Sequence, residues 1–379
     1  MKQLILSLLF FAGICSTGTA QVTITADLFP TVGDTLRTAV DNLPENITIT
    51  PPGGGQTWNY SSLNAPFEVV DVYRDAAEGS VFSEVSDADV LLETAQVGES
   101  YYKVTANAFE LVAVNGGGQI GLNLNTLIRF NPPLIERHEI LTFPQQDVST
   151  SHIFVAMATD DLPQEILDLL DLPLLPDSIR LNIETERSDF VDAWGTMTIP
   201  GGTYDVVRFK RTQTNNIMVE ALVPIIGWTD VTDLVAPFLD NFGNGTTVSY
   251  HFLSDQAKEP IAVVTMNADE TQATQVIFKS NDIFSGLEER ATSQPNVYAY
   301  PNPAIFDTRF EFANLPKGIY TLRIYNILGV PVWEQKYDIA GSRTVKVQLD
   351  TFSKGTYLYS LISPKGKTLM TKRLMIVRP

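Results

Sequence analysis

Residues 193–211 read AWGTMTIPGGTYDVVRFKR, two runs rich in Thr, Val and aromatic residues on either side of Pro200-Gly201-Gly202. Proline and glycine together favour a tight turn, because proline presets one backbone dihedral and glycine tolerates positive φ. β-branched and aromatic residues on both sides are typical of strands. This stretch therefore predicts a β-hairpin with its turn at residues 200–202.

Similar runs recur on both sides of this hairpin. They include FEVVDVY at 67–73, SHIFVAMAT at 151–159 and TTVSYHF at 246–252, with turn residues between them. Residues 21–284 are therefore predicted to be all-β, as one large or two smaller β-sandwiches. The exception is DDLPQEILDLLDLP at 160–173, which predicts a short helix and a division into two halves near residues 160–178.

The N-terminal stretch MKQLILSLLFFAGICSTGTA has a cationic Lys2, an apolar run and small residues before Ala20. This pattern predicts a signal peptide over residues 1–20, and the apolar run is too short to span a bilayer. Cys15, the only cysteine, lies inside it, and the bulky Ile14 before it argues against a lipoprotein. The exported chain then has no disulfide, no thiol nucleophile and no Cys-ligated zinc.

Charge divides the chain, whose net value is −18. Residues 21–290 carry 13 Lys and Arg against 39 Asp and Glu, whereas residues 291–379 carry 12 against 5. Such asymmetry indicates two modules with different partners. The anionic middle argues against nucleic acid as a partner, although an acidic surface also simply keeps a secreted protein soluble.

Residues 285–296 are small, charged and polar, which predicts an exposed linker between these modules. Beyond the linker, Tyr320, Leu322 and Ile324 alternate with Thr321 and Arg323, the period of a half-buried strand. Turn residues at 354–355 and 364–367 separate further short strands. Residues 297–379 are therefore predicted to form a small immunoglobulin-like β-sandwich.

Several motifs in this region carry a resemblance. YPNPA (300–304), LPKGIYTLRIYNILG (315–329), KGTYLYSL (354–361) and TKRLMIV (371–377) resemble, in the family's order, the type A C-terminal sorting domain of the type IX secretion system of Bacteroidota. The motif positions are Pro301, Asn302, Pro303, Gly318, Tyr320, Tyr325, Asn326, Gly329, Gly355, Tyr357, Gly366, Lys367, Lys372 and Arg373.

The resemblance implies a route through the periplasm to the medium or the outer cell surface. Its implied partners are the outer-membrane translocon, a sortase-like peptidase that removes the tail, and surface polysaccharide; we expect the cut within residues 285–297. Taken alone, Lys372 and Arg373 fit a solvated strand face or cations that protect a sheet edge. Within the motif, they are interpreted as a recognition patch.

No motif in residues 21–284 predicts catalysis. Gly116, Gly118 and Gly121 have GxGxxG spacing, but a strand-like run follows, so a hairpin loop is predicted and no nucleotide site. None of the three histidines, at 138, 152 and 251, has metal-ligand spacing with another. No cofactor is predicted, although calcium on acidic loops stays open; residues 240–245 fit turn chemistry better than a calcium loop.

Three readings of this cargo remain. A non-enzymatic surface protein that binds a glycan or another protein is favoured, and a secreted hydrolase of polysaccharide or peptide is the alternative. The third is a spacer that binds no ligand. Glu184 and Glu186 share one strand face, which suits solvent as well as an acid–base pair. Trp58 and Trp194 adjoin glycine turns and are predicted to anchor strands in the core, whereas an exposed Trp would offer a sugar-stacking surface.

Overall fold

The computed structural model contains two β units, the first within residues 21–280 and the second within residues 296–376. It describes residues 21–41, 44–64, 67–94, 97–116, 127–139, 141–159, 176–239, 244–280, 296–300, 302, 304, 307–326, 330–349 and 351–376. The signal peptide, the helix predicted at 160–173 and all but the last residue of the linker predicted at 285–296 lie outside these residues.

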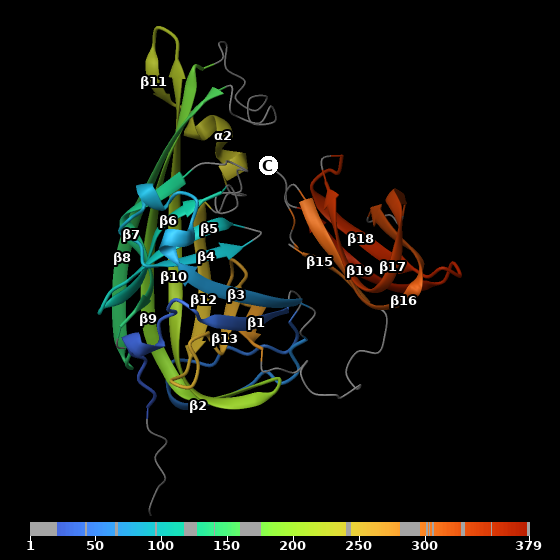
Figure 1. The fold of residues 1–379 in the computed structure, drawn as a ribbon, viewed down its shortest axis with the longest axis horizontal. Coiled ribbons are helices and arrows are strands. Elements are labelled where there is room, and N and C mark those ends of the chain that lie inside the picture. The colour runs from blue at the N-terminus through green and yellow to red at the C-terminus, as the bar shows by residue number, and fades with distance from the viewer. Residues whose placement is uncertain are drawn as a thin grey trace, which may run out of the picture.

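Twelve described strands of the first unit pair into one closed antiparallel ring (Figure 1). Strand β10 closes it, because it pairs with β12 on one side and with β9 on the other. In ring order the strands are β10 (Gly202–Val223), β12 (Gly245–Leu253), β13 (Ala262–Met266), β14 (Ala273–Lys279), β1 (Thr35–Asp41), β3 (Phe67–Asp75), β4 (Val90–Thr94), β5 (Gly98–Val104), β6 (Ala108–Asn115), β7 (Leu127–His138), β8 (Gln145–Ala158) and β9 (Ser178–Ile199).

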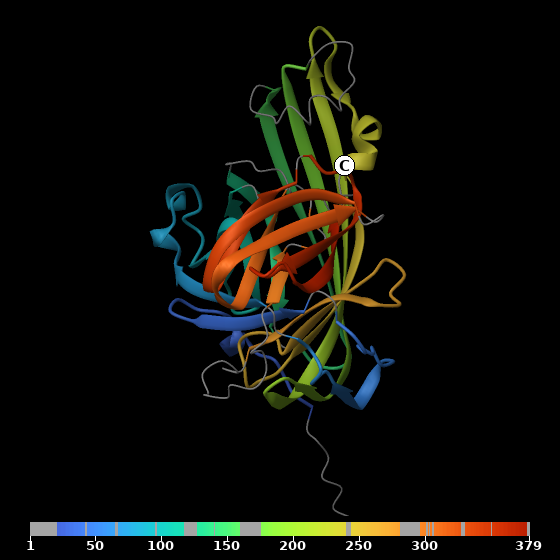
Figure 2. The same cartoon turned by 90° about the vertical axis from the view of Figure 1, so that its right-hand side faces the viewer.

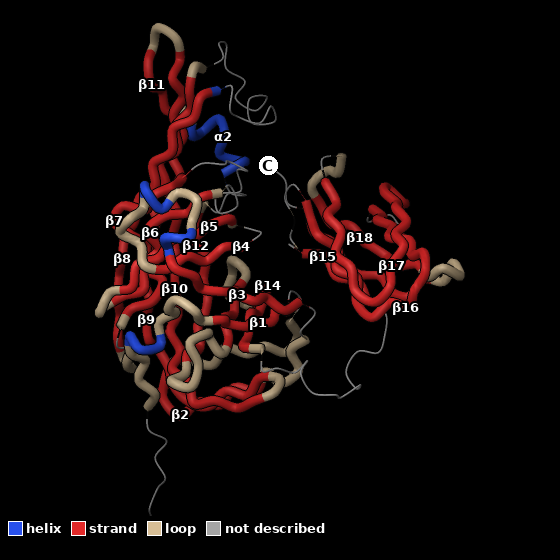
Figure 3. The backbone as a smooth tube through the Cα atoms, in the orientation of Figure 1, coloured by secondary structure: helices blue, strands red, loops and turns tan. Residues whose placement is uncertain are grey.

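Two short strands and four short helical elements lie beside this ring in the described chain. Strand β2 (Gly53–Asn59) runs parallel to β9, and β11 (Gly227–Asp230) pairs with β10. Figure 3 shows how little of the described chain is helical. The helical elements are η1 (Ala26–Leu28), η2 (Ala76–Glu78), η3 (Phe82–Glu84) and α2 (Thr232–Leu239).

The sandwich predicted for residues 21–284 is therefore wrong, although the strands themselves are present. Sandwich and barrel strands both alternate inward and outward residues, so the period of the sequence does not distinguish them. Closure removes the edges that two separate sheets would leave. Strands on both sides of residues 160–175 belong to the same ring, since β8 and β9 pair from Gln145 to Ala158.

The predicted hairpin at residues 200–202 is confirmed. Strands β9 and β10, of 22 residues each, meet at a turn where Gly201 adopts a φ of +85°. Their register shifts between Arg208 and Phe209, which leaves Asp192 as the unpaired residue of a β-bulge. The bulge directs Asp192 toward Arg208, on the opposite face from the neighbouring pair Asp189–Arg211.

Hydrophobic clusters fill both faces of the ring wall. One end of the interior is apolar and includes Ile153, Ile183, Ile217 and Val235 of α2. A second cluster lies on the outer face of β12, β13 and β14 and contains Trp58, which is 2% exposed. The predicted core position of Trp58 is therefore confirmed.

Trp194 is half-buried against β2. A Cβ at Gly54 would lie 2.6 Å from its indole ring. Glycine is therefore required at position 54 for β2 to approach this side chain.

The second unit is a single continuous sheet, seen from another side in Figure 2 in orange to red. Strand β16 pairs with β15 through its first half and with β18 through its second half. Register shifts near Leu315 bend β16. The two halves of the sheet pack against each other through rings such as Phe310 and Tyr359, whose centroids are 5.0 Å apart. The strands are β15 (Asn296–Tyr300), β16 (Asp307–Asn326), β17 (Pro331–Gln348), β18 (Gly355–Ile362) and β19 (Thr368–Ile376).

This arrangement corrects the prediction of a small sandwich of separate short strands. The long, bent β16 and β17 each run through both layers of the core, so the layers stay hydrogen-bonded to each other. The turns predicted at 354–355 and 364–367 are confirmed, since β18 begins at Gly355 and Gly366 donates its backbone N–H to Ser363 O.

Candidate functional site

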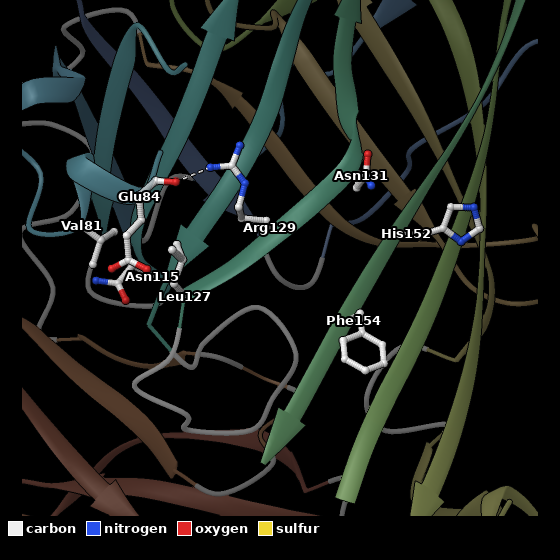
Figure 4. Close-up of a pocket in the computed structure, with 8 residues that line it drawn as sticks. All are labelled: Val81, Glu84, Asn115, Leu127, Arg129, Asn131, His152 and Phe154. Atoms are coloured by element: carbon white, nitrogen blue, oxygen red, sulfur yellow. Dashed lines mark hydrogen bonds between the residues drawn. The ribbon is translucent and has the colours of Figure 1, made fainter. Parts of the chain in front are cut away.

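An open groove lies on the outer side of the ring where β7 and β8 diverge (Figure 4). In the described part of these strands, Phe130 and Ile153 form the one register pair, whereas β8 and β9 pair along their length. Phe130 and Ile153 point inward, so the residues beside them point outward into the groove. The cavity measures about 720 Å³ and is lined by Val81, Glu84, Asn115, Leu127, Arg129, Asn131, His152 and Phe154.

Arg129 is held in place on one wall of the groove. Its Nη1 donates to the backbone oxygen of Glu84 at 2.5 Å, and its Nη2 donates to both oxygens of Asp87 at 2.9 and 3.1 Å. Burial raises the pKa of Asp87, but the hydrogen bonds and charge of Arg129 outweigh burial and hold this pKa below its usual value. The guanidinium is therefore oriented before any ligand arrives.

Asn115 belongs to a second fixed network below this wall. Its Nδ2 donates to Ser80 Oγ and to Glu99 Oε2, and Glu99 also accepts from the Tyr101 hydroxyl. Burial raises the pKa of Glu99. The hydrogen bonds from Ser80, Tyr101 and Asn115 have the larger, opposite effect and lower this pKa to about 2. The charged form of Glu99 is thus part of the native structure at neutral pH.

The opposite wall presents an aromatic ring to solvent. Phe154 is 59% exposed and lies on β8 beside His152, across from Arg129 and Glu84 (Figure 4). Apolar rings are normally buried, so an exposed ring inside a polar groove is a candidate contact for a ligand. The sequence marked His152 only as a strand histidine and did not single out Phe154, because both belong to an ordinary alternating strand.

Two of the three histidines, His152 and His251, lie on different strands, β8 and β12. His251 stacks on Phe209, with ring centroids 4.5 Å apart, and is not in the groove. Burial, followed by the charges of Arg211, Arg187 and Arg137, lowers the pKa of His251 well below its usual value. In the chain as far as it is described, no three His, Cys, Asp or Glu side chains are grouped to hold a metal ion.

Other candidates from the sequence lie partly outside the described residues. Glu184 and Glu186 lie on the outward face of β9. Strands β6 and β7 pair on either side of the glycine-rich stretch that begins at Gly116, as a hairpin loop requires, although residues 117–126 themselves are outside the description. Residues 240–243 of the calcium-like loop are also outside it.

The motif residues of the second unit mainly organise its turns and layers. Asn302 ties the entry segment to β19, since its Nδ2 donates to Arg373 O and its Oδ1 accepts from Met375 N, both at 2.8 Å. The hydroxyls of Tyr320 and Tyr357 donate to Pro316 O and Ser353 O, at 2.9 and 2.8 Å. These contacts explain why an amide and two phenols belong to the motif.

The remaining motif positions serve turns. Gly355 and Gly366 adopt positive φ, and a Cβ at Gly318 would lie 2.7 Å from Pro364. Asn326 Oδ1 accepts from Val330 N, and the backbone N–H of Lys367 donates to Ser363 Oγ. Tyr325 is half-buried, opposite Leu358. Pro301, Pro303 and Gly329 lie outside the described residues.

Lys372 and Arg373 point to opposite faces of β19. The ammonium of Lys372 lies 3.5 Å from the ring centroid of Tyr298 on β15, so this side chain crosses from one edge strand to the other. Arg373 is exposed beside Leu358, its partner on β18. The two cations therefore do not form one patch, because neighbouring residues of a strand alternate between faces.

Comparisons with solved structures find only distant likeness. The dimeric latent PorU from Porphyromonas gingivalis matches at 10% identity and a TM-score of 0.22, over 92% of this chain and 30% of that one. PorZ from the same organism, described as an essential bacterial surface component of the type-IX secretion system, matches at 11% identity and a TM-score of 0.16, over 77% of this chain and 50% of that one. This chain spans half of those chains or less, and such scores support no argument about its fold.

No curated protein matches the chain. No helix in the described ranges is long and apolar enough to cross a membrane. Residues 298–377 match the family model of the secretion system C-terminal sorting domain. The second unit is therefore a type IX secretion C-terminal sorting domain, and the chain is exported through that system to the cell surface or the medium.

Proposed function

We propose that the ring of this exported protein is a binding module that holds a glycan in the groove between β7 and β8. The observation that carries the proposal is Phe154, 59% exposed in a groove whose other walls supply hydrogen-bonding side chains. A sugar ring has an apolar face of C–H groups that packs on an aromatic ring, and hydroxyls that need donors and acceptors. Arg129, Asn131 and His152 provide such groups around Phe154.

The alternative, hydrolysis of a polysaccharide, is less well supported by the same groove. A glycosidase of the common kind needs two carboxyl groups about 5 to 9.5 Å apart across the substrate. Among the described residues that line the groove, Glu84 alone is acidic. The nearby Asp87 is engaged by Arg129 and unsuited to act as an acid, since its pKa is lowered. A peptide ligand remains the second binding candidate.

The sorting domain assigns this module its place outside the cell. We propose that the translocon reads the exposed face of β19 around Arg373, that a sortase-like peptidase cuts within residues 285–297, and that the ring is then released or attached to surface polysaccharide. A cut in that range would leave the closed ring intact, because its last strand ends at Lys279.

The test is a glycan array probed with the full-length chain, followed by an assay of the bound polysaccharides for hydrolysis products. Phe154→Ala should weaken binding of a hit roughly tenfold, since it removes the aromatic ring on which the sugar would pack. Val148→Ala is the matched control, because Val148 is 69% exposed on the same face of β8 and does not line the groove. Binding unaffected by Phe154→Ala would reject this groove, and hydrolysis products would favour the enzyme.

A further inference from the structure

The outward face of β8, β9, β10 and β11 continues from the groove to the end of the ring where β11 lies (Figure 1). On these strands Ile183 and Ile217 belong to the interior cluster, so the residues on either side of each point outward. The register aligns Phe154 with Asn182, and Asn182 with Met218, in one row across three strands. We call the following outward residues the outer platform: Phe154, Asn182, Met218, Arg180, Glu220 and Trp228.

An aromatic ring is held in place at the end of the platform away from the groove. Trp228 is 38% exposed, and the guanidinium carbon of Arg180 lies 4.2 Å from its ring centroid. Arg180 donates to both oxygens of Glu220, at 2.5 and 2.7 Å, and Asn182 donates to the same carboxylate at 3.2 Å. The indole therefore packs on a guanidinium that is itself fixed, so the ring is oriented before any ligand arrives.

The two exposed rings of the platform are far apart. Phe154 on β8 and Trp228 on β11 are separated by three strand spacings, which amounts to about 14 Å. Trp228 pairs with Leu222, four residues beyond Met218 on β10, which adds about 13 Å along the strands. The separation is therefore about 20 Å, with Arg180 and Glu220 between the rings. A disaccharide is too short to contact both rings, whereas a chain of several sugar units can.

The charges on this face favour a neutral ligand. Four carboxylates lie on the platform or beside it, those of Glu184, Glu186, Glu220 and Asp230. Arg180, which is bound to Glu220, is the one Lys or Arg among the described outward residues from Ser178 to Glu186 on β9 and across the strands beside them. Uronate or sulfate groups would be repelled by these carboxylates. The hydroxyls of a neutral sugar can instead donate to carboxylates and accept from amide and guanidinium groups.

We propose that the outer platform binds one extended, neutral polysaccharide chain that runs from the groove to Trp228, an inference that rests on the proposed function of the groove. Phe154 and Trp228 each pack on the apolar face of a sugar unit, and Asn182 and Glu220 bond to hydroxyls of the units between them. The affinity then grows with chain length, because a chain held at one ring reaches the other at a high effective concentration. A protein partner is favoured less, since Glu is depleted from the centre of protein interfaces and Glu220 lies between the two rings.

Isothermal titration of the full-length chain with disaccharides and their parent polymers tests this surface. The pairs are cellobiose with hydroxyethyl cellulose, laminaribiose with laminarin, and mannobiose with mannan, and polygalacturonate is the anionic comparator. We expect a neutral polymer to bind and Trp228→Ala to weaken this binding roughly tenfold, whereas binding of the matching disaccharide at Phe154 stays unchanged. The repeated units of a polymer raise the apparent affinity of parent and variant equally, so the ratio of the two affinities reports on Trp228.

The matched control is Phe190→Ala, which should leave polymer binding unchanged. Phe190 is also 38% exposed on the outward face of β9, but it lies eight residues from Asn182 along that strand. Trp228→Tyr keeps an aromatic ring at the end of the platform and should retain most of the binding. This second variant separates the loss of a sugar contact from a loosening of the hairpin.

The outcomes distinguish the platform from the groove. Polymer binding that Phe154→Ala weakens and Trp228→Ala does not overturns the outer platform and leaves the groove in place. Polymer binding that neither substitution weakens overturns both. Failure of every neutral polymer to bind, or tighter binding of polygalacturonate, overturns the assignment of a neutral polysaccharide to this face.

Discussion

The ring and the sorting domain differ in the kind of polar side chain that they bury. The ring unit buries whole ion pairs, Asp192–Arg208 and Asp189–Arg211, on the two faces of one hairpin. The buried polar residues described in the sorting domain are uncharged, namely Thr308, Thr321 and Ser360. Buried charges tie residues to one specific partner, whereas a hydroxyl can donate to or accept from several kinds of neighbouring polar group. The ring therefore depends on individual pairs, and the sorting domain depends on turns.

Removing the sorting domain is the strongest test of this division of labour. A chain that lacks residues 297–379 should lose secretion and accumulate in the periplasm, with the ring still folded. Cell fractionation with immunoblotting measures the first, and circular dichroism of the periplasmic protein measures the second. Normal secretion of the shortened chain would contradict the export assignment, and an unfolded ring would show that the two units are not independent.

Asp192→Asn tests the dependence of the ring on its charged pairs. Arg208 is 0% exposed and donates to both oxygens of Asp192 at 2.7 Å, so the substitution leaves a buried cation without its counter-ion. We expect a loss of about 3 to 5 kcal/mol in the free energy of unfolding, measured with urea.

Two controls calibrate that loss. Asp87→Asn breaks the exposed pair with Arg129 and should cost about 0 to 1 kcal/mol. Ser360→Ala removes a hydroxyl of the sorting domain that bonds to Thr371 at 2.7 Å, and should cost about 1 kcal/mol. Equal losses for Asp192→Asn and Ser360→Ala would remove the contrast between the two units.

Lys372→Ala and Arg373→Ala separate structure from recognition within one motif. Lys372 packs on Tyr298, so its loss should destabilise the sorting domain by about 1 kcal/mol. Arg373 is exposed, so its loss should change stability by less than about 0.5 kcal/mol while reducing secretion. Thermal unfolding and the secreted fraction are measured for both variants. If Arg373→Ala is secreted normally, the exposed face of β19 is not what the translocon reads.

Glu99→Gln should have a small effect on stability that depends on pH. The pKa of Glu99 falls from 4.5 to about 2 on folding, so the unfolded chain takes up a proton first as the pH drops. The stabilisation from Glu99 is present above about pH 4.5 and is lost progressively toward pH 2. The variant should be about 1 kcal/mol less stable at pH 7 and should lack this acid-dependent loss, measured by urea unfolding from pH 7 to pH 3. Parallel pH profiles for parent and variant would count against the network around Ser80 and Tyr101.

The sorting domain was predictable because its motifs resemble those of a known family, and several of its motif residues act over short distances. Tyr320 bonds to Pro316, Tyr357 bonds to Ser353, and Asn326 bonds to Val330, each four residues away. Such contacts leave fixed spacings in a sequence. The groove and the buried polar contacts inside the ring leave none, since Arg129 meets Asp87 across 42 residues and Arg187 meets Ile135 across 52.

What the sequence alone determined is therefore local: the β content, the turn at residues 200–202, the burial of Trp58 and the motif of the sorting domain. Tertiary structure decided the closed ring in place of a sandwich, the outward position of Phe154, and the opposite faces of Lys372 and Arg373. Alternation along a strand states which residues share a face, and carries no information about which distant strand lies beside it. Closure required β10 to pair with both β9 and β12, and that choice is made by packing across the whole chain.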